Sequence, residues 1–194
     1  MYTPTQVAPT SLADYLEAMS RAVFTAGISW KVIEAKWDGT REAFDHFDPK
    51  KVAAYTPDDV DRLMADPRVI HNHMKILAVI NNAGELIVTD REFGGIEAYL
   101  ASFSDNDELI KDLHRRFGFL GESVAHFFLF GVSFNLPEQE KWAHAHFAGS
   151  QWADSHHDGA SHEGASPEDA HHDGASPNGA PHAGAQRARA RHAS

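Results

Sequence analysis

The chain has 194 residues, of which 42% are hydrophobic and 10% aromatic, enough to fill the core of one domain. It contains no cysteine, which excludes disulfides, thiolate catalysis and zinc sites that need sulfur ligands. Its 17 Lys and Arg against 28 Asp and Glu give a formal net charge of −11, an unfavourable background for binding a phosphate backbone.

The apolar segments are too short to cross a membrane. The longest, at 76–80 and 127–130, fall far below the roughly 18 residues that a spanning helix needs. Residues 1–11 lack the basic and apolar regions of a secretory signal. We therefore expect a cytoplasmic protein with no membrane partner.

Helical patterns begin near the N-terminus. Leu12, Tyr15, Leu16 and Met19 recur at the spacing of one helix face. Another helix start lies at 56–59, where a threonine N-cap precedes a proline and two acids. Both segments predict helices.

A short hairpin at 67–71 follows the second of these helices. Asp66 and Pro67 break that helix, and apolar residues at helical spacing from Ile76 to Ala83 predict the next one. Two helices around a tight hairpin can aim backbone amides at a DNA phosphate. Any two antiparallel helices also need a short turn, so the pattern alone leaves DNA binding open.

Further helices are indicated at 96–103, 105–116, 122–131 and 137–147. Alternating strand patterns are nearly absent, apart from a possible strand at 85–89. The sequence therefore predicts an all-α domain.

Composition changes near residue 150. Residues 151–194 contain no Leu, Ile, Val, Phe or Met, so we expect a disordered tail after a helical domain at 1–150. Paired histidines beside aspartate in the tail also suit metal or partner binding. The tail takes six acids and three arginines from the total of 28 acids and 17 bases, so residues 1–150 keep 22 acids, 14 bases and a net charge of −8.

Several motifs occur in the order and spacing of a known family. They are Ala26-Gly27-Ile28-Ser29-Trp30, Arg41 and Phe44, the segments 47–54, 59–63 and 70–76, Asn82-Ala83, and Phe119-Leu120-Gly121 with the helix after it. On these motifs, residues 12–133 resemble the type I DNA-3-methyladenine glycosylases.

The resemblance implies a helix-hairpin-helix enzyme of base-excision repair, which flips a methylated adenine out of double-stranded DNA and hydrolyses its N-glycosidic bond. Methylation at N3 leaves the base positively charged and a good leaving group, so the enzyme mainly has to extrude, recognise and hold it. Trp30 stands at the family's pocket tryptophan, where an aromatic face suits a cation, although a core indole is the alternative. We expect duplex DNA with a flipped damaged base as the partner of a monomer without a cofactor.

The sequence departs from the family at several pocket positions. The family's pocket glutamate is replaced by Ala22, and Glu17 lies more than a helical turn away, so we do not expect it to take over. The pocket tyrosine is replaced by His126. The family's structural zinc is not expected, because the chain has no cysteine and His144 and His146 alone do not make a site. The catalytic residue stays unassigned.

Glu122 and His126 lie four residues apart in the helix predicted at 122–131. They suit an acid and imidazole pair facing the base pocket. A helix N-terminal glutamate beside a partly buried histidine is the alternative. We take both as candidate base-pocket residues.

Four hairpin residues are candidate DNA contacts, namely His71, Asn72, His73 and Lys75. Asn72 and Lys75 match the family, whereas His71 stands where the family usually has arginine. Asn72 suits capping of the following helix as well as DNA contact.

Three functions remain open. The first is hydrolysis of alkylated, cationic adenine from DNA. The second is a DNA-binding protein on the same fold that has lost catalysis, which Ala22 and the acidity of residues 1–150 favour. The third is a metal-binding or partner-binding module built on the tail at 151–194.

Overall fold

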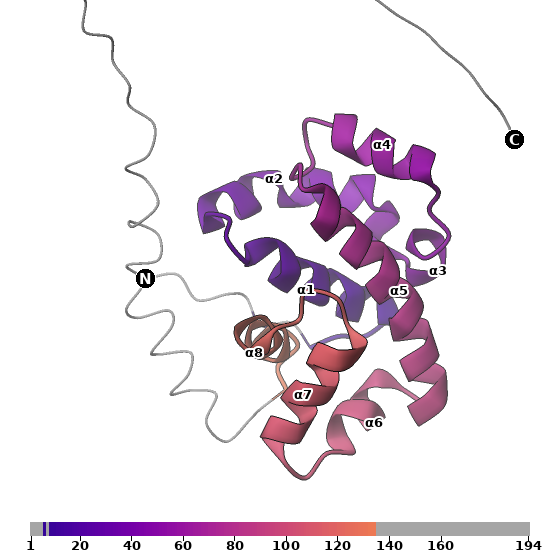
Figure 1. The fold of residues 1–194 in the computed structure, drawn as a ribbon, viewed down its shortest axis with the longest axis vertical. Coiled ribbons are helices and arrows are strands. Elements are labelled where there is room, and N and C mark those ends of the chain that lie inside the picture. The colour runs from indigo at the N-terminus through magenta and orange to yellow at the C-terminus, as the bar shows by residue number, and fades with distance from the viewer. Residues whose placement is uncertain (1–5, 7, 135–194) are drawn as a thin grey trace, which may run out of the picture. The chain divides into compact units, whose positions relative to one another are not determined.

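The structure is a computed structural model that describes residues 6 and 8–134, and every regular element in that part of the chain is helical (Figure 1). This confirms the predicted all-α fold. The elements are α1 (Leu12–Thr25), α2 (Trp30–Ala43), the 3-10 turn η1 (Asp45–Phe47), α3 (Pro49–Val52), α4 (Pro57–Ala65), α5 (His73–Phe93), α6 (Ile96–Ala101), α7 (Asn106–Arg116) and α8 (Glu122–Gly131). None of the described helices is long and apolar enough to cross a membrane.

Some of the predictions fall on other parts of the chain. The helix predicted at 137–147, the histidines His144 and His146, and the tail at 151–194 lie outside the described residues.

The helix starts follow the capping signals in the sequence. At α4, Asp59 accepts hydrogen bonds of 2.9 Å from both the backbone N–H and the hydroxyl of Thr56. At α1, Asp14 accepts from the Ser11 backbone N–H at 2.9 Å, and the Ser11 hydroxyl oxygen accepts from the Asp14 backbone N–H at 3.3 Å. Asp105 caps α7 by accepting from two backbone N–H groups of its first turn. Each cap satisfies amides that a helix leaves unpaired at its start.

The strand considered at 85–89 is wrong, because these residues lie inside the 21-residue helix α5. Their β-branched side chains favour a strand locally. Leu86 and Thr89, three residues apart, are nevertheless both buried, as on one face of a helix. Gly94 ends the helix in the left-handed conformation, with a φ of 74°.

Helix α5 is central to the described fold and packs against α1, α3, α4 and α6. Helix α1 packs in turn against α2 and α8, which brings together segments far apart in the sequence (Figure 1). The core beside α1 is aromatic: Phe24, Phe44 and Phe47 are fully buried, and the rings of Phe44 and Phe47 stack at 5.4 Å. This packing fixes α1 against α2, and the outward faces of these two helices form part of a cavity.

The predicted hairpin is confirmed as the connection 66–72 between α4 and α5. Helix α2 packs closely on it, and the Lys36 ammonium group donates to two hairpin carbonyls at 2.8 and 3.0 Å. Gly39 permits this approach, because a Cβ at that position would lie 2.6 Å from the Cβ of Arg68. The hairpin is therefore tied to α2.

Candidate functional site

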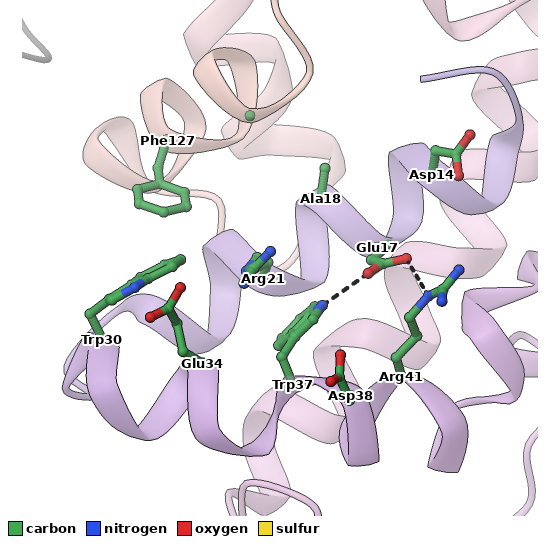
Figure 2. Close-up of a pocket in the computed structure, with 11 residues that line it drawn as sticks. Asp14, Glu17, Ala18, Arg21, Trp30, Glu34, Trp37, Asp38, Arg41 and Phe127 are labelled. Atoms are coloured by element: carbon green, nitrogen blue, oxygen red, sulfur yellow. Dashed lines mark hydrogen bonds and ion pairs between the residues drawn. The ribbon is translucent and has the colours of Figure 1, made fainter. Parts of the chain in front are cut away.

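A cavity of about 530 Å³ opens between α1, α2 and α8 (Figure 2). This volume lies within the roughly 300 to 1,000 Å³ of small-ligand sites. The charged and aromatic side chains on its wall are Trp30, Trp37 and Phe127, the carboxylates Asp14, Glu17, Glu34 and Asp38, and the arginines Arg21 and Arg41. Four carboxylates against two arginines leave the wall with two net negative charges. In the described part of the chain, no three His, Asp or Glu side chains gather closely enough to hold a metal ion.

Trp30, a candidate base-pocket residue, lies on the cavity wall. It is the first residue of α2, and its ring lies 6.1 Å from that of Phe127 on α8, tilted by 41°. Figure 2 shows Phe127 beside the indole of Trp30. The two rings give the cavity an aromatic side that suits a flat ligand.

Arg21 lies between the two tryptophans of the cavity (Figure 2). Its Cζ atom is 5.1 Å from the ring centroid of Trp30 and 5.1 Å from that of Trp37. The Nε atom is buried and has no hydrogen-bond partner among the described residues. Cation–π attraction to two indoles therefore holds this guanidinium in place.

Glu17 presents a fixed carboxylate to the same cavity. Its Oε1 accepts a hydrogen bond of 2.9 Å from Trp37 Nε1, and its Oε2 accepts one of 2.9 Å from Arg41 Nε (Figure 2). Trp37 is itself rigid, since it is only 4% exposed and stacks on Phe47 at 5.6 Å. The Glu17 side chain keeps 24% of its surface exposed, so the carboxylate is oriented yet accessible.

Glu17 was not expected at the site, because its position along α1 does not show in which direction α2 crosses. The signal was the spacing of polar residues. Asp14, Glu17 and Arg21 follow one another at intervals of three and four, which places them on one helix face. Leu16 and Met19, both buried, lie on the inner face.

Ala22 is buried in the core, with 1% of its surface exposed, and is not part of the cavity wall. Its neighbour Arg21 faces the cavity instead. The position that carries a glutamate in the resembling family therefore supplies no carboxylate here.

Glu122 and His126 were candidates for the base pocket, and the structure places neither on the cavity wall. Glu122 is exposed in the first turn of α8, and His126 is half-buried. The face of α8 at the cavity carries Phe127 and Gly131, four residues apart. Successive residues of a helix point about 100° apart, so His126 is turned away from the direction of Phe127.

Asn72 and Lys75, two candidate DNA contacts, are occupied within the fold. Asn72 caps α5, because its Oδ1 accepts from the Lys75 backbone N–H at 3.1 Å. The Lys75 side chain is 5% exposed, and its ammonium group donates to the carbonyls of Phe24, at 3.1 Å, and Ala26 at the end of α1. Burial lowers the pKa of Lys75 to about 8. The expectation that Lys75 contacts DNA is therefore corrected. Its ammonium group instead satisfies carbonyls that α1 leaves unpaired.

His71 and His73, the other two candidates, are exposed at the hairpin. The Nε2 atom of His71 lies 2.7 Å from the carbonyl oxygen of Asp66. Arg68, which the hairpin pattern did not single out, is an exposed cation of the same hairpin and pairs with Asp66 at 2.8 Å and with Glu42 at 3.0 Å. Hydrogen bonds from Arg68 lower the pKa of Asp66 to about 2.

The chain matches a family model described as methyladenine glycosylase over residues 10–127. It is 31% identical over 88 residues to a DNA-3-methyladenine glycosylase of Haemophilus influenzae, an alignment that covers 45% of this chain and 48% of that protein. It is 30% identical over 125 residues to DNA-3-methyladenine glycosylase 1 of Escherichia coli, covering 54% of this chain and 67% of that one. The chain thus spans about half the length of the first relative and two thirds of the second.

Solved structures agree with this assignment. The fold is similar to that of a crystal structure of 3-methyladenine DNA glycosylase I, with a TM-score of 0.58 and 25% identity over 66% of this chain and 82% of the other. It is also similar to 3-methyladenine DNA glycosylase I from Staphylococcus aureus, studied for its recognition of 3-methyladenine, with a TM-score of 0.56 and 29% identity over 68% and 79% of the two chains. Because the family model covers more than half of the sequence, the chain belongs to the methyladenine glycosylase family.

Proposed function

We propose that this protein hydrolyses the N-glycosidic bond of an alkylated, cationic adenine in DNA. The observation that carries the proposal is the cavity, which joins the rings of Trp30 and Phe127 to a wall with two net negative charges. A flat aromatic cation is the ligand that such a wall favours, through stacking and through charge. An adenine methylated at N3 and still bound to its sugar is a ligand of this kind.

The reaction needs little from the protein beyond binding the positively charged base. The bond between C1′ and N9 breaks, its electron pair stays with N9, and the base leaves as neutral 3-methyladenine. Positive charge passes to C1′ and O4′ of the sugar, and water adds at C1′ and releases one proton to a carboxylate or to solvent. A carboxylate near the sugar stabilises the transition state more than the bound substrate, which is the condition for catalysis.

The proposed partner is double-stranded DNA with the damaged base flipped out, bound by a monomer in the cytoplasm. The hairpin 66–72 and the start of α5 support the DNA contact, because Arg68 and His71 of the hairpin and His73, the first residue of α5, are exposed. The first turn of α5 adds backbone N–H groups, which a helix leaves available at its start for anions. The absence of cysteine from the sequence suits a reducing compartment.

The test is base release from duplex DNA that carries single defined lesions, measured by chromatography against an enzyme-free blank, because cationic bases also leave spontaneously. We expect release of 3-methyladenine above the blank and no release of a neutral lesion such as uracil. Release of neutral lesions alone would contradict the proposal.

A second function rests on Ala22, which leaves the family's glutamate position without a carboxylate. On this alternative the protein binds damaged DNA and does not cleave it. Tight binding of methylated duplex by a folded protein that releases no base would establish the alternative.

A further inference from the structure

From the geometry of the cavity we infer that Glu17 is the carboxylate that serves base release in this protein, in place of residue 22. The inference rests on the proposed function, since it names a catalytic residue for that reaction. It assigns the role to a different turn of α1 from the one that the family resemblance indicates.

The carboxylate of Glu17 is held in a fixed orientation. Both oxygens of Glu17 are fixed by nitrogen donors, Trp37 Nε1 and Arg41 Nε, each at 2.9 Å. The indole of Trp37 is buried and held by stacking on Phe47. A carboxylate fixed in this way needs no reorganisation as charge develops nearby, which is the property that makes electrostatic stabilisation effective.

The carboxylate of Glu17 also keeps unused hydrogen-bond acceptor positions. A carboxylate offers about four acceptor positions, and within the described residues each oxygen of Glu17 accepts one hydrogen bond. The side chain also keeps 24% of its surface exposed. Acceptor positions therefore remain for a water molecule or for the hydrogen atoms of a ligand.

The other carboxylates of the cavity are either engaged in a helix cap or exposed to water. Asp14 is engaged in capping α1, where its Oδ2 accepts from the backbone N–H groups of Thr10 and Ser11 at 2.8 and 2.9 Å. Glu34 and Asp38 are exposed to water, which screens their charge. Glu17 is therefore half-buried where Glu34 and Asp38 are exposed, and it is not engaged in capping as Asp14 is.

In the reaction, the carboxylate of Glu17 stabilises the positive charge as it moves from the base to C1′ and O4′ of the sugar. No bond to Glu17 forms. The water that adds at C1′ loses its proton to this carboxylate or to solvent, which balances the step. Arg41 weakens the field of Glu17 by pairing with it, so the two residues should act in opposite directions on a cationic ligand.

The competing explanation is structural, because Glu17 also joins α1 to α2 through Trp37 and Arg41. Glu17→Gln separates the two explanations. The amide oxygen still accepts from Trp37, whereas the negative charge is lost. Glu42→Gln is the matched control. Glu42 also lies on α2, but it pairs with Arg68 of the hairpin and is not part of the cavity wall.

The experiment measures two quantities for the parent, Glu17→Gln, Arg41→Met and Glu42→Gln. One is the single-turnover rate of 3-methyladenine release from methylated duplex. The other is the calorimetric affinity for 3,9-dimethyladeninium, a cation at neutral pH, and for neutral 9-methyladenine. We expect Glu17→Gln to lower both the release rate and the cation affinity by about tenfold or more, with the neutral affinity unchanged. Arg41→Met should raise the cation affinity, and Glu42→Gln should leave the cation affinity unchanged.

An unchanged release rate in folded Glu17→Gln would overturn the inference while the proposed function stands. If the parent releases no base, the proposed function fails, and the ligand affinities still decide the role of Glu17. The inference is overturned if the parent and Glu17→Gln prefer 3,9-dimethyladeninium over 9-methyladenine equally. It is also overturned if the parent binds no cation.

Discussion

The guanidinium of Arg21 lies 5.1 Å from the ring centroids of both Trp30 and Trp37, in the cavity where we propose that a cationic base binds. A guanidinium group and a methylated adenine are both planar, delocalised cations. Both therefore stack on the same aromatic faces, and their like charges repel one another. Arg21 therefore opposes the binding of the ligand that the rest of the wall attracts.

Replacing Arg21 by Met should strengthen the binding of 3,9-dimethyladeninium by roughly three- to tenfold, because a cation close to the Trp30 ring is removed. Calorimetric titration of the parent and the variant measures the change. Weaker binding by Arg21→Met would mean that the guanidinium contacts the ligand favourably, and the assigned opposition would then be incorrect.

Single residues could be predicted from the sequence where their role is local or lies within a motif. The capping role of Asn72 is predictable because a cap acts within three residues, and the motif around Trp30 made this residue a candidate for the base pocket, which stays a prediction. The partners of Lys75 and Glu17 are 51 and 20 residues away in the chain. Such contacts depend on how helices cross, which the spacing of apolar residues does not specify.

At the scale of elements, the close contact between α2 and the hairpin 66–72 carries a direct prediction. Gly39→Ala should lower the free energy of unfolding by about 1 to 2 kcal/mol, because its Cβ would meet the Cβ of Arg68 at 2.6 Å. This cost exceeds the gain of about 1 kcal/mol that alanine normally brings to a helix interior.

Gly84→Ala is the matched control in the interior of α5, since a Cβ there meets nothing within 4 Å. It should raise the free energy of unfolding by up to about 1 kcal/mol through helix propensity alone. Urea unfolding of the two variants measures both effects. Equal shifts of the same sign would show that α2 and the hairpin are less tightly packed than described.

Elements with strong end signals were predicted well. The helix expected at 122–131 is α8 (Glu122–Gly131), and α7 (Asn106–Arg116) begins directly after its cap Asp105. The segment 85–89 was misassigned because its β-branched residues favour a strand locally, while packing on the core keeps them in α5. The rotation of α8 that brings Phe127 to the cavity, and not His126, is also set by packing between helices.

At the scale of the whole described domain, one partly buried network joins three helices. Asp112 of α7 accepts hydrogen bonds from the Tyr99 hydroxyl on α6 at 2.9 Å and from Arg116 Nε at 2.8 Å. Arg116 also pairs with Glu92 of α5 at 2.9 Å. Burial acts to raise the pKa of Asp112, but hydrogen bonds from Arg116 and Tyr99 outweigh it and hold the pKa below its usual 3.8.

Asp112→Asn should lower the free energy of unfolding by about 2 to 4 kcal/mol at neutral pH, since it removes the charge that Arg116 faces. Because the pKa of Asp112 is lower in the folded protein, its stabilisation is present above pH 3.8 and is lost as pH falls through the folded value. Urea unfolding at pH 7 and pH 3 should therefore show a difference between parent and variant that shrinks at pH 3. A difference that is constant with pH would contradict the assigned role of the carboxylate.

The cavity itself belongs to the whole domain, because α1, α2 and α8 each supply part of its wall. Its aromatic side joins Trp30 to Phe127, which are nearly a hundred residues apart in the sequence. We propose that this cavity binds the cationic base that is released from DNA.

The most direct test of this claim is the single-turnover rate of 3-methyladenine release from methylated duplex DNA by the parent, Trp30→Phe and Trp30→Ala, each corrected for the enzyme-free rate. We predict release above the blank by the parent and by Trp30→Phe, which keeps an aromatic face. Trp30→Ala should be slower by about tenfold or more, because base stacking contributes roughly 1 to 3 kcal/mol. A folded parent that releases base no faster than the blank, or a Trp30→Ala variant as fast as the parent, would contradict the account.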